Sequence, residues 1–364
     1  MTNNVKKLVN EGQSIWQDDI SRELIENGSL KAAIEETGVR GVTSNPTIFQ
    51  KAISGSDTYD AEIKSLLAEG KDAAEVFQTV AVKDIQDACD LFRPIYDETD
   101  GGDGFVSLEV LPSLARDTEG TIENGRTLWQ AVNRPNLMIK VPGTAEGVPA
   151  VKQLLLEGVN VNITLLFSLE NYEAVARAYI DALQARADLG QPIDKLASVA
   201  SFFVSRVDTA ADKQLDEIGS DEANSLKGKA AIANAVLAYE KFEEIFSGEQ
   251  WEALAAKGAK VQRPLWASTG VKNPDYPATL YVDTLIGPDT INTAPTATIK
   301  AFLESGTVAR TVDSDYAGAH KVMTDLAALG VDIDTITAKL EEDGIASFMT
   351  SYDDLLATVD GKKA

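Results

Sequence analysis

The 364-residue sequence predicts an α/β protein built as a (β/α)8 barrel, or TIM barrel, with additional helices. Two observations carry this prediction. Short apolar or β-branched runs recur eight times along the chain, and longer segments with helical periodicity separate them. A strand followed by a helix, repeated throughout, implies parallel strands that are buried on both faces. Eight such repeats favour a closed barrel over an open sheet.

The predicted strands are apolar runs that end in polar residues. They are SIWQDD (14–19), GVTSN (41–45), FVSLEVL (105–111), NLMIKVPG (136–143), NVNITLLF (160–167), SVASFFVSR (198–206), RPLWASTG (263–270) and DTINTAP (289–295). The helical patterns between them include SRELIENGSLKAAIEET (21–37), TIENGRTLWQAVN (121–133), GTAEGVPAVKQLLLEG (143–158) and SLENYEAVARAYIDALQARADLG (168–190). Each helical pattern follows a predicted strand, as a barrel requires.

We expect residues 1–364 to form one domain, because no Ser/Gly-rich linker and no short repeat divides the chain. Two gaps between strands, about 46–104 and 207–262, are too long for one helix and are interpreted as helical insertions. In the second gap, 223–246 is expected to be the main helix. The tail from about 308 to 364 has further helical pattern, and we expect it to pack on the outside of the barrel or over its mouth.

The composition excludes several classes of partner. The chain carries 33 basic and 57 acidic residues, a net charge of −24, which disfavours a nucleic-acid or anionic-membrane surface. The single cysteine, Cys89, fits a reducing compartment. The first residues lack the apolar core of a signal peptide, and no apolar run approaches the roughly 20 residues of a membrane span. The sequence therefore predicts a cytoplasmic protein in which any anionic ligand binds a locally positive pocket.

Candidate functional residues are the polar side chains late in each predicted strand, because the sites of such barrels lie at the carboxyl ends of the strands. These residues are Asp18, Asp19, Ser44, Asn45, Glu109, Lys140, Asn162, Thr164, Ser201, Arg206 and Ser268, with Lys272 nearby.

Lys140 interrupts an apolar strand, and its neighbours Leu137, Ile139 and Val141 remove water from its ammonium group. Such an environment should lower the pKa of the lysine. A lysine that is partly neutral can attack a ketone and form an iminium, which accepts electrons when a neighbouring C–C bond breaks. The alternative is a lysine that reaches out from the strand end, or one paired with a buried carboxylate such as Glu109.

Carboxylates could perform the proton transfers of this chemistry. Asp18 and Glu109 serve as general base and acid if they converge on Lys140. The alternative for Asp18 is a cap of the helix that follows it. Asn45 and Asn162 are either amides that hold substrate hydroxyls or satisfied structural amides.

An anion site is suggested by Ser201 and Arg206 on the sixth predicted strand and by Ser268 with Lys272 after the seventh. A surface ion pair is the alternative for Arg206. With one histidine (His320) and one cysteine in the chain, zinc and Ser-His-Asp chemistry fit poorly, and no metal or cofactor is expected.

Seven segments resemble, in order, the signature blocks of the longer bacterial transaldolases and span most of the chain. They are IWQDDISRE, GVTSNPTIF, VSLEVLP, NLMIKVPGT, VNITLLFS, SVASFFVSRVD and WASTGVKNP. The resemblance implies transfer of a dihydroxyacetone unit from sedoheptulose 7-phosphate or fructose 6-phosphate to glyceraldehyde 3-phosphate or erythrose 4-phosphate. This is a reaction of the non-oxidative pentose phosphate pathway, and it needs no cofactor.

The resemblance also implies roles for single residues. Lys140 matches the Schiff-base lysine and Asp18 the acid/base residue, while Glu109 and Thr164 match the pair that handles a catalytic water. The remaining matches are amides for donor hydroxyls (Asn45, Asn162) and a phosphate grip (Ser201, Arg206). The family's second phosphate-binding arginine is missing after WAST, where Lys272 is the candidate substitute.

Two other functions stay open from the sequence: a hydrolytic Schiff-base aldolase on the same barrel, and a non-catalytic barrel that binds sugar phosphates. The expected ligands are sugar phosphates, and the sequence does not distinguish a monomer from a homodimer.

Overall fold

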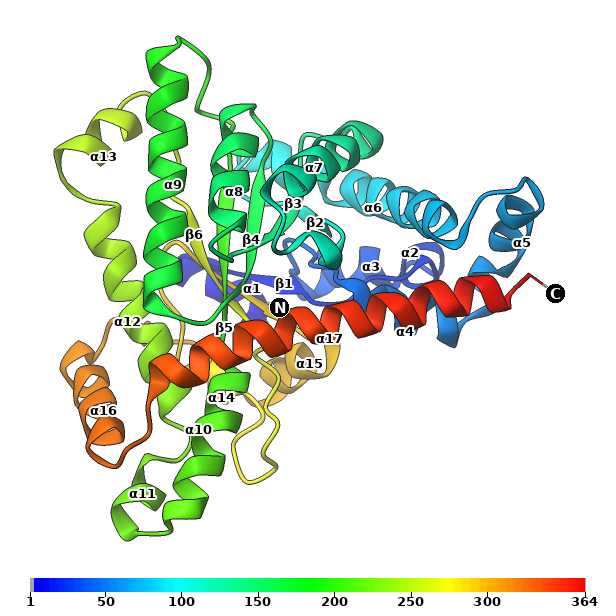
Figure 1. Cartoon of the computed structure of the whole chain (residues 1–364). Coiled ribbons are helices and arrows are strands. Elements are labelled where there is room, and N and C mark those ends of the chain that lie inside the picture. The colour runs from blue at the N-terminus through cyan, green and yellow to red at the C-terminus, as the bar shows by residue number, and fades with distance from the viewer. Residues whose placement is uncertain (1–2, 364) are drawn as a thin grey trace.

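The computed structural model describes residues 3–363, and its centre is one parallel sheet (Figure 1). Seven strands form the sheet in the order β1-β7-β6-β5-β4-β3-β2, and every pair of neighbours is parallel. The strands are β1 (Gln13–Gln17), β2 (Val106–Glu109), β3 (Leu137–Pro142), β4 (Val161–Leu166), β5 (Ser198–Phe203), β6 (Arg263–Ala267) and β7 (Thr290–Ala294). Because all strands run the same way, their carboxyl ends meet at one edge of the sheet.

The predicted strand 41–45 is not a strand, and this corrects the count of eight. Only Val42 pairs, through isolated parallel bridges to Gln17 in β1 and to Val106 in β2. These partners lie in the two edge strands of the sheet, so Val42 connects both edges. Extended pairing stops within three residues because Asn45 accepts a hydrogen bond from the Ile48 backbone (3.0 Å) and starts a helix.

The observed strands are also shorter than predicted at their carboxyl ends. β5 ends at Phe203, so Arg206 lies in the first turn of helix α10 (Ser205–Ile218) and not on a strand. β6 ends at Ala267 because Ser268 adopts a left-handed conformation with φ of 55°. Arg206 and Ser268 thus lie in the helix start and the loop that follow these strands, whereas Ser201 lies on β5.

Helices cover the sheet and fill the two predicted insertions (Figure 1). The others are α1 (Asn4–Leu8), α2 (Arg22–Glu26), α3 (Ser29–Ala32), α4 (Pro46–Gly55), α5 (Asp60–Ala68), α6 (Ala73–Glu98), α7 (Thr118–Val132), α8 (Gly147–Leu156), α9 (Leu169–Asp188), α11 (Asp221–Leu226), α12 (Ala230–Ile245), α13 (Gly248–Ala255), α14 (Leu280–Asp283), α15 (Thr296–Ser305), α16 (Tyr316–Ala328) and α17 (Ile333–Gly361). The helix expected over 223–246 is divided into α11 and α12, because Gly228 between them has φ of 72°.

The tail of the chain forms the long helix α17, which crosses the molecule and reaches α4 (Figure 1). Thr47 of α4 and Ser351 of α17 share a hydrogen bond of 2.7 Å, and the rings of Phe77 and Tyr352 meet edge to face at 5.9 Å. Phe348 of the same helix lines the cavity described below. The tail was expected to pack either on the outside of the barrel or over its mouth. Helix α17 lies over the mouth, at the carboxyl ends of the strands.

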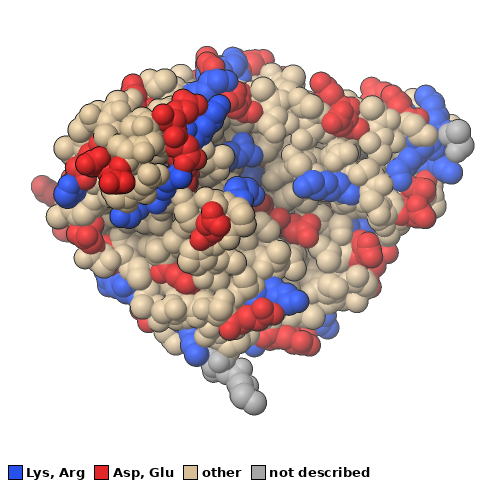
Figure 2. Space-filling view, turned by 90° about the horizontal axis from the view of Figure 1, so that it is seen from below, with Lys and Arg blue, Asp and Glu red and all other residues tan. Residues whose placement is uncertain are grey.

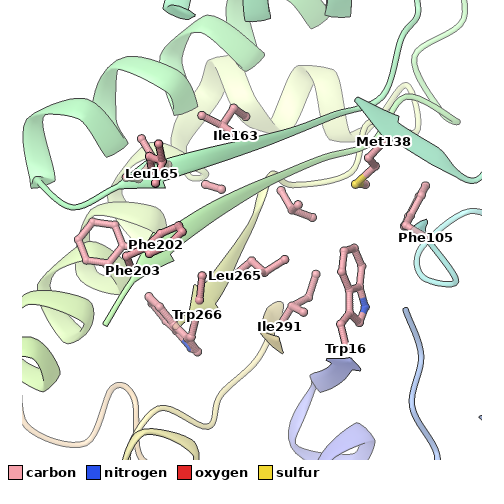
Figure 3. Packing of buried hydrophobic residues seen from close by; sticks show 14 of the residues in the cluster. Trp16, Phe105, Met138, Ile163, Leu165, Phe202, Phe203, Leu265, Trp266 and Ile291 are labelled. Atoms are coloured by element: carbon pink, nitrogen blue, oxygen red, sulfur yellow. The ribbon is translucent and has the colours of Figure 1, made fainter. Parts of the chain in front are cut away.

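Large apolar side chains fill the interior between the strands (Figure 3). Trp16 on β1 is fully buried and lies 6.2 Å from the ring of Phe105, with Met138 and Ile291 nearby in the view. Gly41 passes directly over the indole, because a Cβ atom at this position would lie 2.6 Å from the ring atoms of Trp16. Close packing on Trp16 thus requires glycine beside the bridging residue Val42.

Gly41→Ala is expected to destabilise the protein by about 1–3 kcal/mol, because a methyl group forced against a fixed indole overpacks the core. Urea unfolding followed by circular dichroism would measure the loss. Gly55→Ala at the end of α4 is the matched control, since its added Cβ would meet nothing within 4 Å. Equal unfolding midpoints for the two variants would contradict the prediction.

The surface is mixed in charge. Figure 2 shows acidic and basic side chains interspersed over one face, with Lys or Arg side chains inside a hollow near its centre. Within residues 3–363 no helix is long and apolar enough to cross a membrane.

Candidate active site

A cavity of about 710 Å³ lies at the carboxyl ends of the strands, where the sequence predicts the site. It brings together residues from β3, β5, β6 and β7, from the loops that follow β1 and β6, and from helices α2, α4, α10, α15 and α17. Eight of the twelve predicted site residues line it: Asp18, Asp19, Asn45, Lys140, Ser201, Arg206, Ser268 and Lys272. The other four, Ser44, Glu109, Asn162 and Thr164, do not line this cavity, and their side chains are buried. The predicted residues therefore gather at one place.

Lys140 is a buried lysine that lines this cavity. Its side chain is 5% exposed, and Nζ donates a hydrogen bond to the Ser44 carbonyl oxygen at 3.1 Å. The Glu109 carboxyl lies 3.7 Å from Nζ, because Glu109 and Lys140 are direct partners in the register of β2 and β3. The lysine thus has both the cavity and a carboxyl group within reach of its amine.

Glu109 is held in a state that suits proton transfer near neutral pH. Burial raises its pKa, the charge on Lys140 opposes the rise and the charge on Asp18 adds to it, and together they bring the pKa to about 7. Neither carboxyl oxygen has a hydrogen-bond partner within the described chain, and the same is true of the buried Thr164 hydroxyl. Buried polar groups are nearly always hydrogen-bonded, so both groups are suited to a small polar ligand.

Asn162 stands in a short chain of buried side chains that fixes its amide. Its Nδ2 atom donates to Ser107 Oγ at 2.9 Å, and Ser201 Oγ donates to Asn162 Oδ1 at 2.6 Å. Ser201 thus contacts Asn162 directly while it also lines the cavity. Asn162 is the register partner of Lys140 on the neighbouring strand, so this chain of hydrogen bonds lies beside the lysine.

Asp18 is not a helix cap. The cap of α2 is Ser21, whose hydroxyl accepts a hydrogen bond from the Leu24 backbone at 3.2 Å. Asp18 Oδ1 instead accepts a hydrogen bond from Thr43 Oγ1 at 2.6 Å, at the wall of the cavity. Burial raises the pKa of the adjacent Asp19, and the charge of Asp18 raises it further.

Besides Lys140, three basic side chains line the cavity, Lys51, Arg206 and Lys272, and so do three acidic ones, Asp18, Asp19 and Glu23. Burial lowers the pKa of Arg206, whose guanidinium lies 5.5 Å above the centre of the Phe203 ring. No salt bridge to any of these three basic side chains occurs within residues 3–363, so the ion pair considered for Arg206 is not seen there. Ser268 lies at the same wall, with Oγ 3.0 Å from Ser205 Oγ.

Several cavity residues were missed by sequence reasoning. Thr43 and Thr293 are polar residues late in predicted strands, so the rule that found the others could have found them. Lys51 comes from an inserted helix and Phe348 from the tail. No strand-end signal marks those two, because their position depends on how α4 and α17 fold over the sheet.

The remaining chemistry-bearing residues lie elsewhere. His320 is exposed on α16 and pairs with Glu240 at 2.8 Å. Cys89 is buried in α6, where burial raises the pKa of its thiol. Residues 3–363 contain no group of three or more His, Cys, Asp or Glu side chains placed to hold a metal ion.

Comparison with known proteins gives matches over nearly the whole chain. Residues 15–359 match the family model described as transaldolase/fructose-6-phosphate aldolase. A transaldolase of Acidothermus cellulolyticus is 49% identical, covering 99% of this chain and 96% of the relative. Transaldolases of Frankia alni and Trichodesmium erythraeum are 47% and 46% identical, over 99% and 100% of this chain and 97% and 98% of their own.

Proposed function

The chain belongs to the transaldolase/fructose-6-phosphate aldolase family, and we propose that it is a transaldolase that works through a Schiff base on Lys140. One observation carries the mechanism: Lys140 lines the cavity, and its amine lies 3.7 Å from the Glu109 carboxyl group, whose pKa is about 7. The donor is sedoheptulose 7-phosphate or fructose 6-phosphate. The acceptor is glyceraldehyde 3-phosphate or erythrose 4-phosphate.

The first step joins the donor to the enzyme. Neutral Lys140 Nζ attacks the ketone carbon C2, and the former carbonyl oxygen becomes a hydroxyl group. Glu109 in its protonated form supplies the proton with which this hydroxyl leaves as water, and Thr164 holds the water. General acid catalysis of this kind is most effective when the pKa of the acid is near the working pH. The product is an iminium at C2.

The second step breaks the C3–C4 bond. Asp18 takes the proton of the C4 hydroxyl, the bonding electrons move into the iminium, and a neutral enamine forms as the aldose phosphate leaves. C3 of the enamine then attacks the aldehyde carbon of the acceptor, and Asp18 returns its proton to the new hydroxyl. Water finally releases the product from Lys140. Asn45, which lines the cavity, holds a donor hydroxyl during these steps, and Asn162 can add only the Nδ2 hydrogen that does not go to Ser107.

The phosphate group of each substrate binds the basic wall of the cavity, and Ser201 and Ser268 lie beside that wall. Arg206 offers a forked pair of N–H donors that suits a phosphate, and Lys272 adds a second positive charge. Both residues lack a carboxylate partner in the described chain, so their charge is available to an anion. This wall is the locally positive pocket that an acidic protein of net charge −24 needs for such substrates.

Arg206→Met is expected to raise KM for fructose 6-phosphate about 10- to 100-fold with a smaller effect on kcat, because one charge-assisted contact to the phosphate is lost. The assay is repeated with unphosphorylated fructose, for which wild type and variant should behave alike. Arg126→Met is the control, since Arg126 pairs with Glu157 on the outer surface. Equal losses with both donors would contradict a phosphate contact.

We extend the proposal to the architecture. Val42 is bonded to both edges of the sheet, through Val42 N to Phe105 O at 3.0 Å and Ser107 N to Val42 O at 3.0 Å on the β2 side. We propose that this one-residue bridge closes the seven-stranded sheet into a barrel. The buried apolar residues form one cluster from Val5 to Val359, which supports a single domain.

We also propose that the protein is located in the cytoplasm.

The rival within the family is an aldolase that releases the three-carbon unit to water. Product analysis separates the two functions. With fructose 6-phosphate and erythrose 4-phosphate, a transaldolase forms sedoheptulose 7-phosphate, and with the donor alone it stops after about one turnover. Continuous release of free dihydroxyacetone without an acceptor would establish the aldolase and overturn transfer as the main reaction.

A further inference from the structure

We propose that Thr43 and Thr293 are positioning residues for the proton transfer at Asp18. This inference rests on the proposed function of Asp18. The two hydroxyl groups form a one-way hydrogen-bond chain that ends on the carboxylate. Within residues 3–363, neither hydroxyl is hydrogen-bonded to Lys140. Their effect on the reaction therefore passes through the orientation of Asp18.

The chain is short and buried. Thr43 Oγ1 lies 2.6 Å from Asp18 Oδ1 and 2.6 Å from Thr293 Oγ1. Thr43 is 1% exposed and Thr293 is 3% exposed, although both border the cavity. Hydrogen bonds in such a setting are stronger than in water, and successive bonds polarise one another.

The direction of the chain follows from counting hydrogens. A threonine hydroxyl has one hydrogen, and an ionised carboxylate can only accept. Thr43 therefore gives its hydrogen to Asp18, and Thr293 gives its own to Thr43. Oδ1 of Asp18 is engaged, so Oδ2 is the oxygen that remains to take a proton from a substrate hydroxyl.

The main chain holds the three residues in this arrangement. The Asp18 backbone N–H donates to Ala294 O at 2.9 Å, and the Thr43 backbone N–H donates to Gln17 O at 3.0 Å. The Thr269 hydroxyl shares its one hydrogen between Asn292 Oδ1 at 2.8 Å and the Thr293 carbonyl oxygen at 3.0 Å. Asp18 follows β1, and Thr43 and Thr293 come from the segments that flank β1 on its two sides. The hydroxyls thus meet across β1, on the side where the cavity lies.

This arrangement predicts which step depends on the two threonines. Imine formation uses Lys140 and Glu109, which the chain does not touch. Cleavage of the C3–C4 bond needs the Asp18 carboxylate turned toward the C4 hydroxyl. A loss of the chain should therefore slow cleavage and leave imine formation unchanged. A purely structural role would instead weaken every step or the fold itself.

The test compares Thr43→Val, Thr293→Val and the conservative Thr43→Ser with wild type. Each protein is mixed with fructose 6-phosphate, trapped with borohydride after a short interval, and weighed intact. The trapped lysine carries a six-carbon phosphate chain before cleavage and a three-carbon chain after it. For Thr43→Val, kcat should fall about 10- to 100-fold with KM changed less than about two-fold, as expected when a bond to a charged group is lost.

The trapped species distinguish the outcomes. In Thr43→Val the total adduct should match wild type while the six-carbon form replaces the three-carbon form. Thr293→Val should show a smaller shift, and Thr43→Ser should restore the wild-type ratio. An unchanged ratio in folded Thr43→Val, or a parallel loss of both adducts, would overturn the inference. If Thr43→Val fails to fold, the ratio in Thr293→Val decides. Absence of any adduct in wild type would instead overturn the proposed function.

Discussion

Lys140→Ala is expected to lose transfer activity by on the order of 10⁴-fold or more, because the covalent route through this amine disappears. Borohydride with fructose 6-phosphate should add mass to wild type on the peptide that contains residue 140. The variant should gain none. Its fold should survive, because alanine fits a strand and removes a buried charge.

Two controls make this result interpretable. Lys64→Ala removes an exposed lysine on α5 that does not line the cavity, and this variant should keep full activity and full labelling. Circular dichroism melting checks that Lys140→Ala is folded. Labelling of folded Lys140→Ala at the wild-type level, or activity within ten-fold of wild type, would rule out Lys140 as the Schiff-base residue.

Glu109→Gln is expected to lower kcat/KM about 10²- to 10⁴-fold and to remove a limb from its pH profile. The direction follows from the raised pKa: with a pKa of about 7, Glu109 is protonated below pH 7 and ionised above it. The acid that expels water from the carbinolamine is therefore present below pH 7 and lost above it. Wild-type kcat/KM should therefore fall as the pH rises through about 7.

The control for this profile is another buried carboxyl outside the cavity. Burial raises the pKa of Asp208 to about 6, but its oxygens accept hydrogen bonds from Ala231 N and Tyr281 Oη, away from Lys140. Asp208→Asn should keep the limb near pH 7. A limb that persists unchanged in Glu109→Gln would assign it to a different group.

The strand positions could be predicted from the sequence, because the hydrophobic pattern that marks a strand lies within a few neighbouring residues. All seven observed strands lie within predicted ones apart from one added residue at the start of β1, and the family assignment is confirmed by the comparisons. The prediction of a strand at 41–45 was wrong, although a signal against it was present in the same segment. Asn45 before Pro46 is a strong helix start, and it competed with the β-branched pattern of the preceding residues.

The parts of the cavity that could not be predicted depend on long-range packing. Lys51 and Phe348 reach the site only because α4 and α17 lie against each other, and neither helix carries a local signal of that contact. The hydrogen-bond directions around Asn162 and Asp18 are likewise set by neighbouring strands. The residue roles themselves stay predictions until the variants are measured.

The placement of α17 has a consequence for how the protein is made. Its contacts with α4 join residues about 300 positions apart, as in the 2.7 Å hydrogen bond between Thr47 and Ser351. Every strand leaves the ribosome before α17 is synthesised, so the nascent sheet exists for a time without the helix that covers its catalytic end. Contacts of such sequence separation form late, because loop closure must precede them. Activity should therefore appear only once α17 has been synthesised and has packed against α4.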